Sequence, residues 1–129
     1  MATFKMELNQ LKDTLLKIED YLNCADGKTK FKVMFIAEEL LTNLVRHADF
    51  EGKTPSITLK IESDKKGSFK MECADNAKTF NLQERKDPNI DARLEDRELG
   101  GLGIYLIKKY AQELQYKHEN GFNILRLSL

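Results

Sequence analysis

Two pairs of segments in which apolar and polar residues alternate constrain the fold of this 129-residue chain most strongly. Residues 57–62 and 69–73 form the first pair, and residues 114–118 and 125–129 form the second. Alternation with a period of two is typical of half-buried strands, and the short turns between the members, DKKG and NG, favour tight hairpins. The sequence therefore predicts two antiparallel hairpins rather than a βαβ series.

Three other segments show the three-and-four spacing of apolar residues that indicates amphipathic helices. The first begins at Asn9, the expected N-cap, and runs to about Tyr21, with Gly27 closing that section. The second covers residues 31–47, and the third follows Gly100 with a buried stripe that reaches Leu114. With a short first strand at residues 3–8, the prediction is an α+β two-layer sandwich in which three helices cover one face of a mixed, mostly antiparallel sheet.

The composition fits one globular domain that spans residues 1–129. Lysine plus arginine (21) equal aspartate plus glutamate (21), so no overall field favours binding to nucleic acid. The N-terminus has no signal-peptide core and no stretch that could cross a bilayer, so we expect a cytoplasmic protein without a membrane partner. Cys24 and Cys73 form no C-x-x-C motif and are expected to be reduced thiols without a chemical role.

The helix over residues 31–47 places Glu39 and Asn43 one turn apart, on the side opposite to the predicted core stripe. A carboxylate and a carboxamide in that arrangement can face a hydrated cation or activate a hydroxyl group. An isolated E-x-x-x-N pattern is more often only the solvated side of an amphipathic helix. Phe35 and Ile36 lie on the same side and are candidates for a pocket floor or a partner surface.

Two further features are weak alone and gain weight by their order. Asp75 ends a predicted strand, where it serves either as a turn residue or as an acceptor for the exocyclic amine of adenine. Gly100 to Gly103 open a helix after a polar stretch, and their free N–H groups suit phosphate, although a flexible hinge or a tight turn is the simpler interpretation.

In combination, these motifs resemble those of a known superfamily. AEELLTNLVRHA, CADNAKTFN and ELGGLGIYLIKKYAQELQY with ENGFNILRL are similar to the N box and the two glycine boxes of GHKL ATPases and kinases, and within them to the stand-alone anti-sigma-factor serine/threonine kinases of bacteria. The similarity covers nearly the whole chain. It implies a Bergerat-type site for ATP and Mg²⁺, with a mobile ATP lid at about residues 77–100.

The resemblance also implies roles for individual residues. Glu39 matches the catalytic base, Asn43 the magnesium ligand and Asp75 the adenine-recognising aspartate. The other implied nucleotide-binding residues are Arg46, His47, Ala77, Arg93, Arg97, Gly100, Gly101, Leu102 and Gly103. Two positions depart from the family pattern, because Ala77 replaces the glycine of D-x-G and Phe122 stands where many members carry a threonine.

The function that the resemblance implies is phosphorylation of a STAS-type antagonist protein by a regulatory serine/threonine kinase. A sigma factor or another regulator is a further expected partner, and such kinases often form homodimers. The alternative is a non-catalytic interaction module, with or without ATP, that acts by sequestering its partner.

Overall fold

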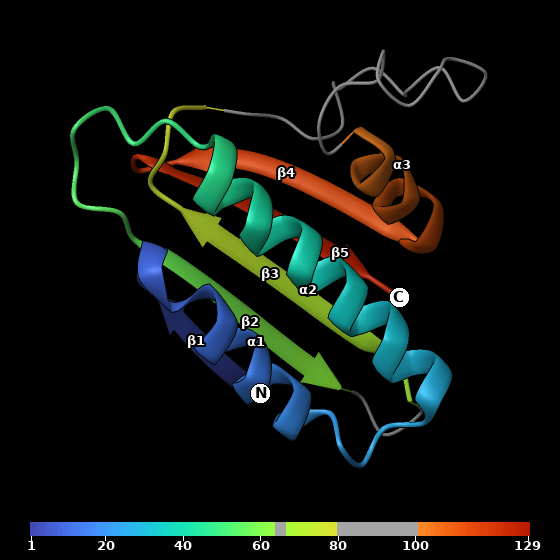
Figure 1. Ribbon diagram of the computed structural model, residues 1–129. Coiled ribbons are helices and arrows are strands. Elements are labelled where there is room, and N and C mark those ends of the chain that lie inside the picture. The colour runs from blue at the N-terminus through green and yellow to red at the C-terminus, as the bar shows by residue number, and fades with distance from the viewer. Residues whose placement is uncertain (64–66, 80–100) are drawn as a thin grey trace.

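A five-stranded antiparallel sheet with three helices on one face forms the protein (Figure 1), as the computed structural model shows for residues 1–63, 67–79 and 101–129. The strands are β1 (Ala2–Met6), β2 (Ile57–Ser63), β3 (Phe69–Asp75), β4 (Glu113–Glu119) and β5 (Phe122–Ser128), in the spatial order β1-β2-β3-β5-β4. The helices are α1 (Leu11–Tyr21), α2 (Gly27–His47) and α3 (Gly101–Tyr110), and a 3-10 turn, η1 (Leu8–Gln10), precedes α1. The predicted α+β two-layer architecture is confirmed.

Both predicted hairpins are present. Strands β2 and β3 pair in antiparallel register, and so do β4 and β5. Asn120 and Gly121 have φ values of 54° and 81°, the left-handed conformation that a type I′ turn requires at both central positions. Strand β5 then pairs with β3, which brings Asp75 directly opposite Asn123 although the two are far apart in the sequence.

The core lies between the sheet and the helices. The inward residues of β2, β3 and β5 alternate with outward polar ones and pack against one side of α2. The fully buried side chains of this core include Ile18, Val33, Ile36, Leu41, Leu59, Ile61 and Ile107. Each buried aliphatic side chain of this kind contributes roughly 1.5–3 kcal/mol. Ile36 is therefore a core residue, and it is neither the pocket floor nor the partner surface that the sequence analysis offered as alternatives.

Helix α2 begins four residues earlier than predicted, because Asp26 caps it. The Oδ1 atom of Asp26 accepts a hydrogen bond from the backbone N–H of Thr29 at 2.9 Å, and Oδ2 accepts one from the Thr29 hydroxyl at 2.7 Å. Both hydrogen bonds favour the ionised carboxylate and lower the pKa of Asp26. Gly27 is consequently the first residue of α2 and does not terminate the preceding section.

Other predicted boundaries also shift by a few residues. Asn9 lies inside η1 and caps no helix, because Glu7 and Gln10 form a capping box there. Helix α3 ends at Tyr110, so Leu114 belongs to β4 rather than to the helical stripe. In the part of the chain that the structure describes, no helix is both long and apolar enough to cross a membrane.

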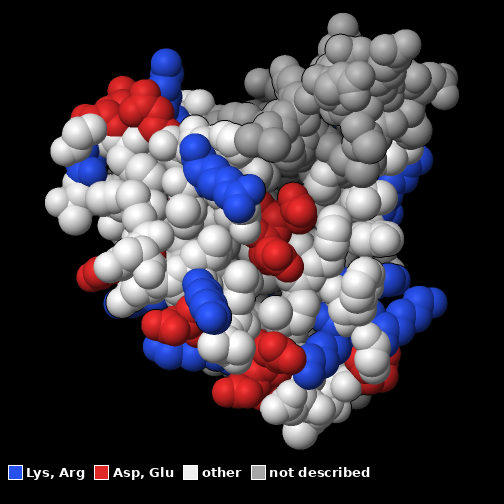
Figure 2. Space-filling view, viewed as in Figure 1, with Lys and Arg blue, Asp and Glu red and all other residues white. Residues whose placement is uncertain are grey.

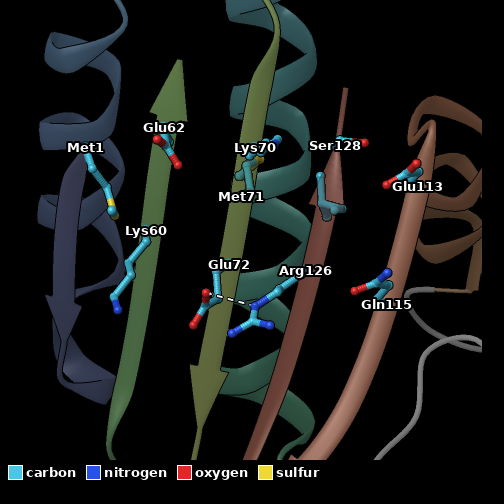
Figure 3. A pocket seen from close by; sticks show the side chains of 11 residues that line it. Met1, Lys60, Glu62, Lys70, Met71, Glu72, Glu113, Gln115, Arg126 and Ser128 are labelled. Atoms are coloured by element: carbon cyan, nitrogen blue, oxygen red, sulfur yellow. Dashed lines mark hydrogen bonds and ion pairs between the residues drawn. The ribbon is translucent and has the colours of Figure 1, made fainter. Parts of the chain in front are cut away.

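None of the helices that the structure describes covers the other face of the sheet, which is charged. A cavity of about 360 Å³ lies there, and most of the residues that line it carry polar or charged side chains (Figure 3). Across it, Nε of Arg126 donates to Oε2 of Glu72 at 3.1 Å, between directly opposed positions of β5 and β3. An exposed pair of this kind contributes about 1 kcal/mol or less. This face has the character of a solvated sheet surface rather than of a small-molecule pocket.

Candidate functional site

A second cavity, of about 240 Å³, lies on the helix-covered side of the sheet, between the C-terminal half of α2 and strands β3, β4 and β5. Apolar walls with a few polar groups are typical of small-molecule sites. Four predicted site residues meet here: Asn43 and His47 from α2, and Asp75 and Ala77 from the end of β3 and the chain after it. We call this cavity the α2–β3 pocket.

Asp75 is the last residue of β3, and its side chain is only 7% exposed. Its Oδ1 accepts hydrogen bonds from the Ala77 N–H at 3.0 Å and from Nδ2 of Asn123 at 2.9 Å. Burial raises the pKa of Asp75, and those two hydrogen bonds and the nearby charges of His118 and Lys53 partly oppose the rise. Because both of these donors meet Oδ1, the other oxygen, Oδ2, can accept from an amine in the pocket.

The chain that follows β3 is anchored by its own hydrogen bonds. The Asn76 side chain accepts from the Ser56 N–H at 2.8 Å and donates to the Thr54 carbonyl at 2.9 Å. Ala77 is 4% exposed and lines the pocket. The position that departs from the family's glycine therefore adds a methyl group to the pocket wall, while its N–H holds Asp75.

Asn123 is a site residue that the sequence reasoning missed. It is 5% exposed, lines the pocket and contacts Asp75 directly. Counting from Gly121 puts the family's threonine position at Phe122, yet Phe122 is not part of the pocket lining. The signal that finds Asn123 is the alternation of β5, because Asn123 shares the inward face with Leu125 and Leu127.

Glu39 of α2 lies directly against Gly103 in the first turn of α3. A Cβ atom placed on Gly103 would collide with Oε2 of Glu39, so any other residue there would force the carboxylate to move. The same turn exposes backbone N–H groups, which attract anions at the start of a helix. The structure thus brings the predicted base and one of the predicted phosphate-binding glycines together from separate parts of the chain.

The sequence predicted that Glu39 and Asn43 lie on the side of α2 opposite the core. In the structure both lie at the border of the core. Both are half-buried, and Asn43 lines the α2–β3 pocket beside the core residue Leu40. Figure 2 shows acidic side chains gathered over the middle of α2. Burial and the negative charge of Glu38 raise the pKa of Glu39, and the positive charge of Arg46 opposes them. A carboxylate with a raised pKa is a better proton acceptor.

The remaining predicted residues occupy less constrained positions. Arg46 and His47 are exposed in the last turn of α2, and of the two only His47 lines the pocket. Gly101 and Leu102 open α3. Arg93, Arg97 and Gly100, together with nearly all of the predicted lid, lie outside the described residues.

The oxygen donors at the pocket fit a magnesium ion that is bound together with a nucleotide. The described residues contain no group of three or more His, Cys, Asp or Glu side chains that could hold a metal ion. Mg²⁺ usually takes one or two protein oxygens and completes its shell with phosphates and water. The Asn43 carboxamide on the pocket wall can supply such an oxygen.

An antiparallel sheet backed by three helices, with a pocket that ends on a buried aspartate, is the arrangement that the resemblance to GHKL ATPases and kinases implies. The family model for the "histidine kinase-like ATPase domain" matches residues 4–129. The chain belongs to this family.

A named relative is similar to the chain over most of its length. The chain is 27% identical over 102 residues to the serine/threonine-protein kinase BtrW of Bordetella bronchiseptica, an alignment that covers 79% of this chain and 71% of the relative.

Solved structures show the same fold. The SiaB–SiaC complex of Pseudomonas aeruginosa matches with a TM-score of 0.65 and 17% identity, over 100% of this chain and 89% of that one. The RsbU and RsbW domains of Rv1364c from Mycobacterium tuberculosis match with a TM-score of 0.64 and 13% identity, over 99% of this chain. This chain spans about a third (32%) of the Rv1364c chain.

Proposed function

We propose that this chain is a serine/threonine protein kinase that uses ATP and Mg²⁺ to phosphorylate a small antagonist protein of the STAS type. The observation that carries the proposal is the contact between Glu39 and Gly103 beside the α2–β3 pocket. In this contact a carboxylate, the proton acceptor of the proposal, lies next to the start of a helix, and a helix start suits phosphate. The named kinase relative supports the same reaction class. A sigma factor or another regulator is a second partner in this proposal.

Binding rests on two ends of the site. At the inner end, Oδ2 of Asp75 accepts a hydrogen bond from the exocyclic amine of adenine, and the apolar side chains of Leu40, Leu44 and Leu125 line the wall around the base. At the outer end, the N–H groups of the first turn of α3 bind the phosphates. A magnesium ion on Asn43 would supply positive charge that offsets the phosphate charge during transfer.

The transfer step requires one proton acceptor. The hydroxyl oxygen of the partner's serine forms a bond to the γ-phosphorus, and the bond from that phosphorus to the β–γ bridging oxygen breaks, so that ADP leaves. Glu39 takes the hydroxyl proton, and its raised pKa suits that role. The protein otherwise contributes positioning, which accounts for most of the catalysis in phosphoryl transfer.

A second candidate function is a binding module that keeps the fold but transfers no phosphate. Phe31 favours it, because this side chain is 63% exposed on α2 and stacks on Phe35 with ring centroids 6.3 Å apart. Exposed aromatic side chains of this kind are common in protein interfaces. In this case the partner is held by occupancy of the surface alone.

Nucleotide titration tests the shared first step. We expect calorimetry to show binding of ATP in the presence of Mg²⁺ and much weaker binding when the metal is chelated, because Asn43 reaches the triphosphate through the ion. If neither ATP nor ADP binds at millimolar concentration with Mg²⁺, the nucleotide site is refuted and the module without nucleotide replaces it.

A further inference from the structure

The side-chain nitrogen of Asn123 joins β5 to the end of β3. Nδ2 lies 2.9 Å from Oδ1 of Asp75, 3.0 Å from the carbonyl oxygen of Ala77 and 3.1 Å from that of Lys78. Two of these partners are backbone carbonyls, which can only accept hydrogen bonds. The nitrogen of the amide must therefore face them, and the orientation of the amide is fixed by chemistry.

The side-chain oxygen of Asn123 is held from the opposite side by β4. It accepts a hydrogen bond from the Tyr116 hydroxyl and lies 3.2 Å from Nδ1 of His118. The pairing of β4 with β5 sets both neighbours, since His118 is directly opposite Asn123. Both ends of a buried amide are thus engaged, so its position in the pocket wall is rigid.

The rigid amide determines how Asp75 meets the pocket. Asn123 and the Ala77 N–H both donate to Oδ1, from different directions. Two donors on one oxygen fix the plane of the carboxylate, and the other oxygen then has a defined place. A hydrogen bond to a ligand gains strength when its acceptor is positioned before binding, because less freedom is lost.

We propose that Asn123 is a positioning residue that determines base specificity, by holding Oδ1 of Asp75 so that Oδ2 meets an exocyclic amine. The inference rests on the proposed nucleotide site and adds the origin of its selectivity. A purine with an amine at this place donates to Oδ2. A purine with a carbonyl there puts two acceptors together, which repel. The preference for the amine depends on the carboxylate being unable to turn away.

Asn123 also differs from a hydroxyl residue in the number of its donors. A threonine or serine has one O–H hydrogen, whereas the amide has two N–H hydrogens, so it can donate to Asp75 with one and share the other between the neighbouring carbonyls of Ala77 and Lys78. The same side chain therefore fixes the recognition carboxylate and the chain that leaves β3.

The test compares ATP with inosine triphosphate, which carries an oxygen in place of the exocyclic amine. Calorimetry with Mg²⁺ gives the Kd of each nucleotide for the wild type, Asn123→Ala, Asn123→Leu and Asn76→Ala. Asn123→Leu keeps the shape of the side chain without its donors, and it carries the test if the alanine variant does not fold. Asn76→Ala is the matched control, because it removes the two hydrogen bonds of the Asn76 side chain, directly after Asp75, and none that reaches the Asp75 carboxylate.

We expect the wild type to prefer ATP and both Asn123 variants to lose that preference on the order of tenfold, mostly through weaker binding of ATP. Asn76→Ala should keep the wild-type ratio of the two constants even where it lowers the melting temperature. An unchanged ratio in the Asn123 variants, with ATP bound by the wild type, would reduce Asn123 to a structural residue. Failure of the wild type to bind either nucleotide would instead refute the site itself and this inference with it.

Discussion

Replacement of Asp75 by asparagine probes the proposed recognition of adenine with almost no change of shape. Oδ1 of Asp75 accepts two hydrogen bonds, from Ala77 and Asn123, and both donors would repel an NH₂ group. In the Asp75→Asn variant the amide oxygen must therefore stay at that place, and the NH₂ group must point into the pocket, at the amine of adenine. Two donors then face each other where a donor faced an acceptor.

The cost follows from the interaction that is lost. A hydrogen bond to a charged acceptor contributes about 1–3 kcal/mol, so the Kd for ATP should rise about 5- to 150-fold. Calorimetric titration with ATP in the presence of Mg²⁺ measures this Kd. The matched control is Glu72→Gln, which makes the same chemical change to a carboxylate on the uncovered face of the sheet and should leave the Kd unchanged. Equal affinities of Asp75→Asn and the wild type for ATP would show that Asp75 does not contribute to nucleotide binding.

The same variant separates binding from stability. Burial raises the pKa of Asp75 above its usual value of 3.8, so the folded state holds this proton more tightly than the unfolded state. Its contribution to stability is complete below about pH 3.8 and is lost as the pH rises through the folded pKa. Relative to Asp75→Asn, which does not titrate, the wild type should lose melting temperature over that range. A constant difference at all pH values would contradict the assigned burial effect.

Two other substitutions test the packing around the site. Gly103→Ala places a methyl group against the carboxylate of Glu39, so we expect the rate of phosphotransfer to fall about 10²-fold. The melting temperature should stay at or above that of the wild type, because alanine has a higher helix propensity than glycine. An unchanged rate would contradict the contact between Glu39 and Gly103. Ile36→Ala should lower the free energy of unfolding by about 2–5 kcal/mol, because Ile36 is fully buried. The control is Phe31→Ala at an exposed position of the same helix, which should lower it by about 1 kcal/mol or less. Denaturant titrations that give similar losses for the two variants would place Ile36 outside the core.

Local patterns predicted the elements well, because alternation and turn chemistry act over a few residues. Both hairpins followed from the period of two and from the NG turn, and the structure has them in the expected pairing. Asn123 was missed because the family motif was counted from Gly121, although alternation with Leu125 points inward at that position. The start of α2 was missed because Asp26 and Gly27 are equally common in turns.

Contacts between segments that are far apart in the chain could not be predicted from local patterns in the sequence. Nothing local indicates that Glu39 lies against Gly103, since the contact depends on how α2 and α3 pack on the same sheet. The sequence analysis also put Glu39 and Asn43 opposite the core, because the spacing of residues along a helix does not show that a pocket lies beside Leu40. Helical spacing gives the angle between two side chains, and the neighbouring elements determine which face of the helix is buried.

The central claim is that Glu39 is the proton acceptor of a protein kinase, and Glu39→Gln tests it most directly. Glutamine keeps the size of the side chain but cannot take a proton, so phosphoryl transfer should fall roughly 10²–10⁴-fold while the Kd for ATP changes little. The assay mixes wild type or variant with ATP, Mg²⁺ and the STAS-type protein encoded nearest to this chain's gene, and follows serine phosphorylation by mass spectrometry. Transfer by the wild type and its loss in the variant are the predicted results. Complex formation in which neither protein transfers phosphate would contradict the claim and leave the non-catalytic binding module.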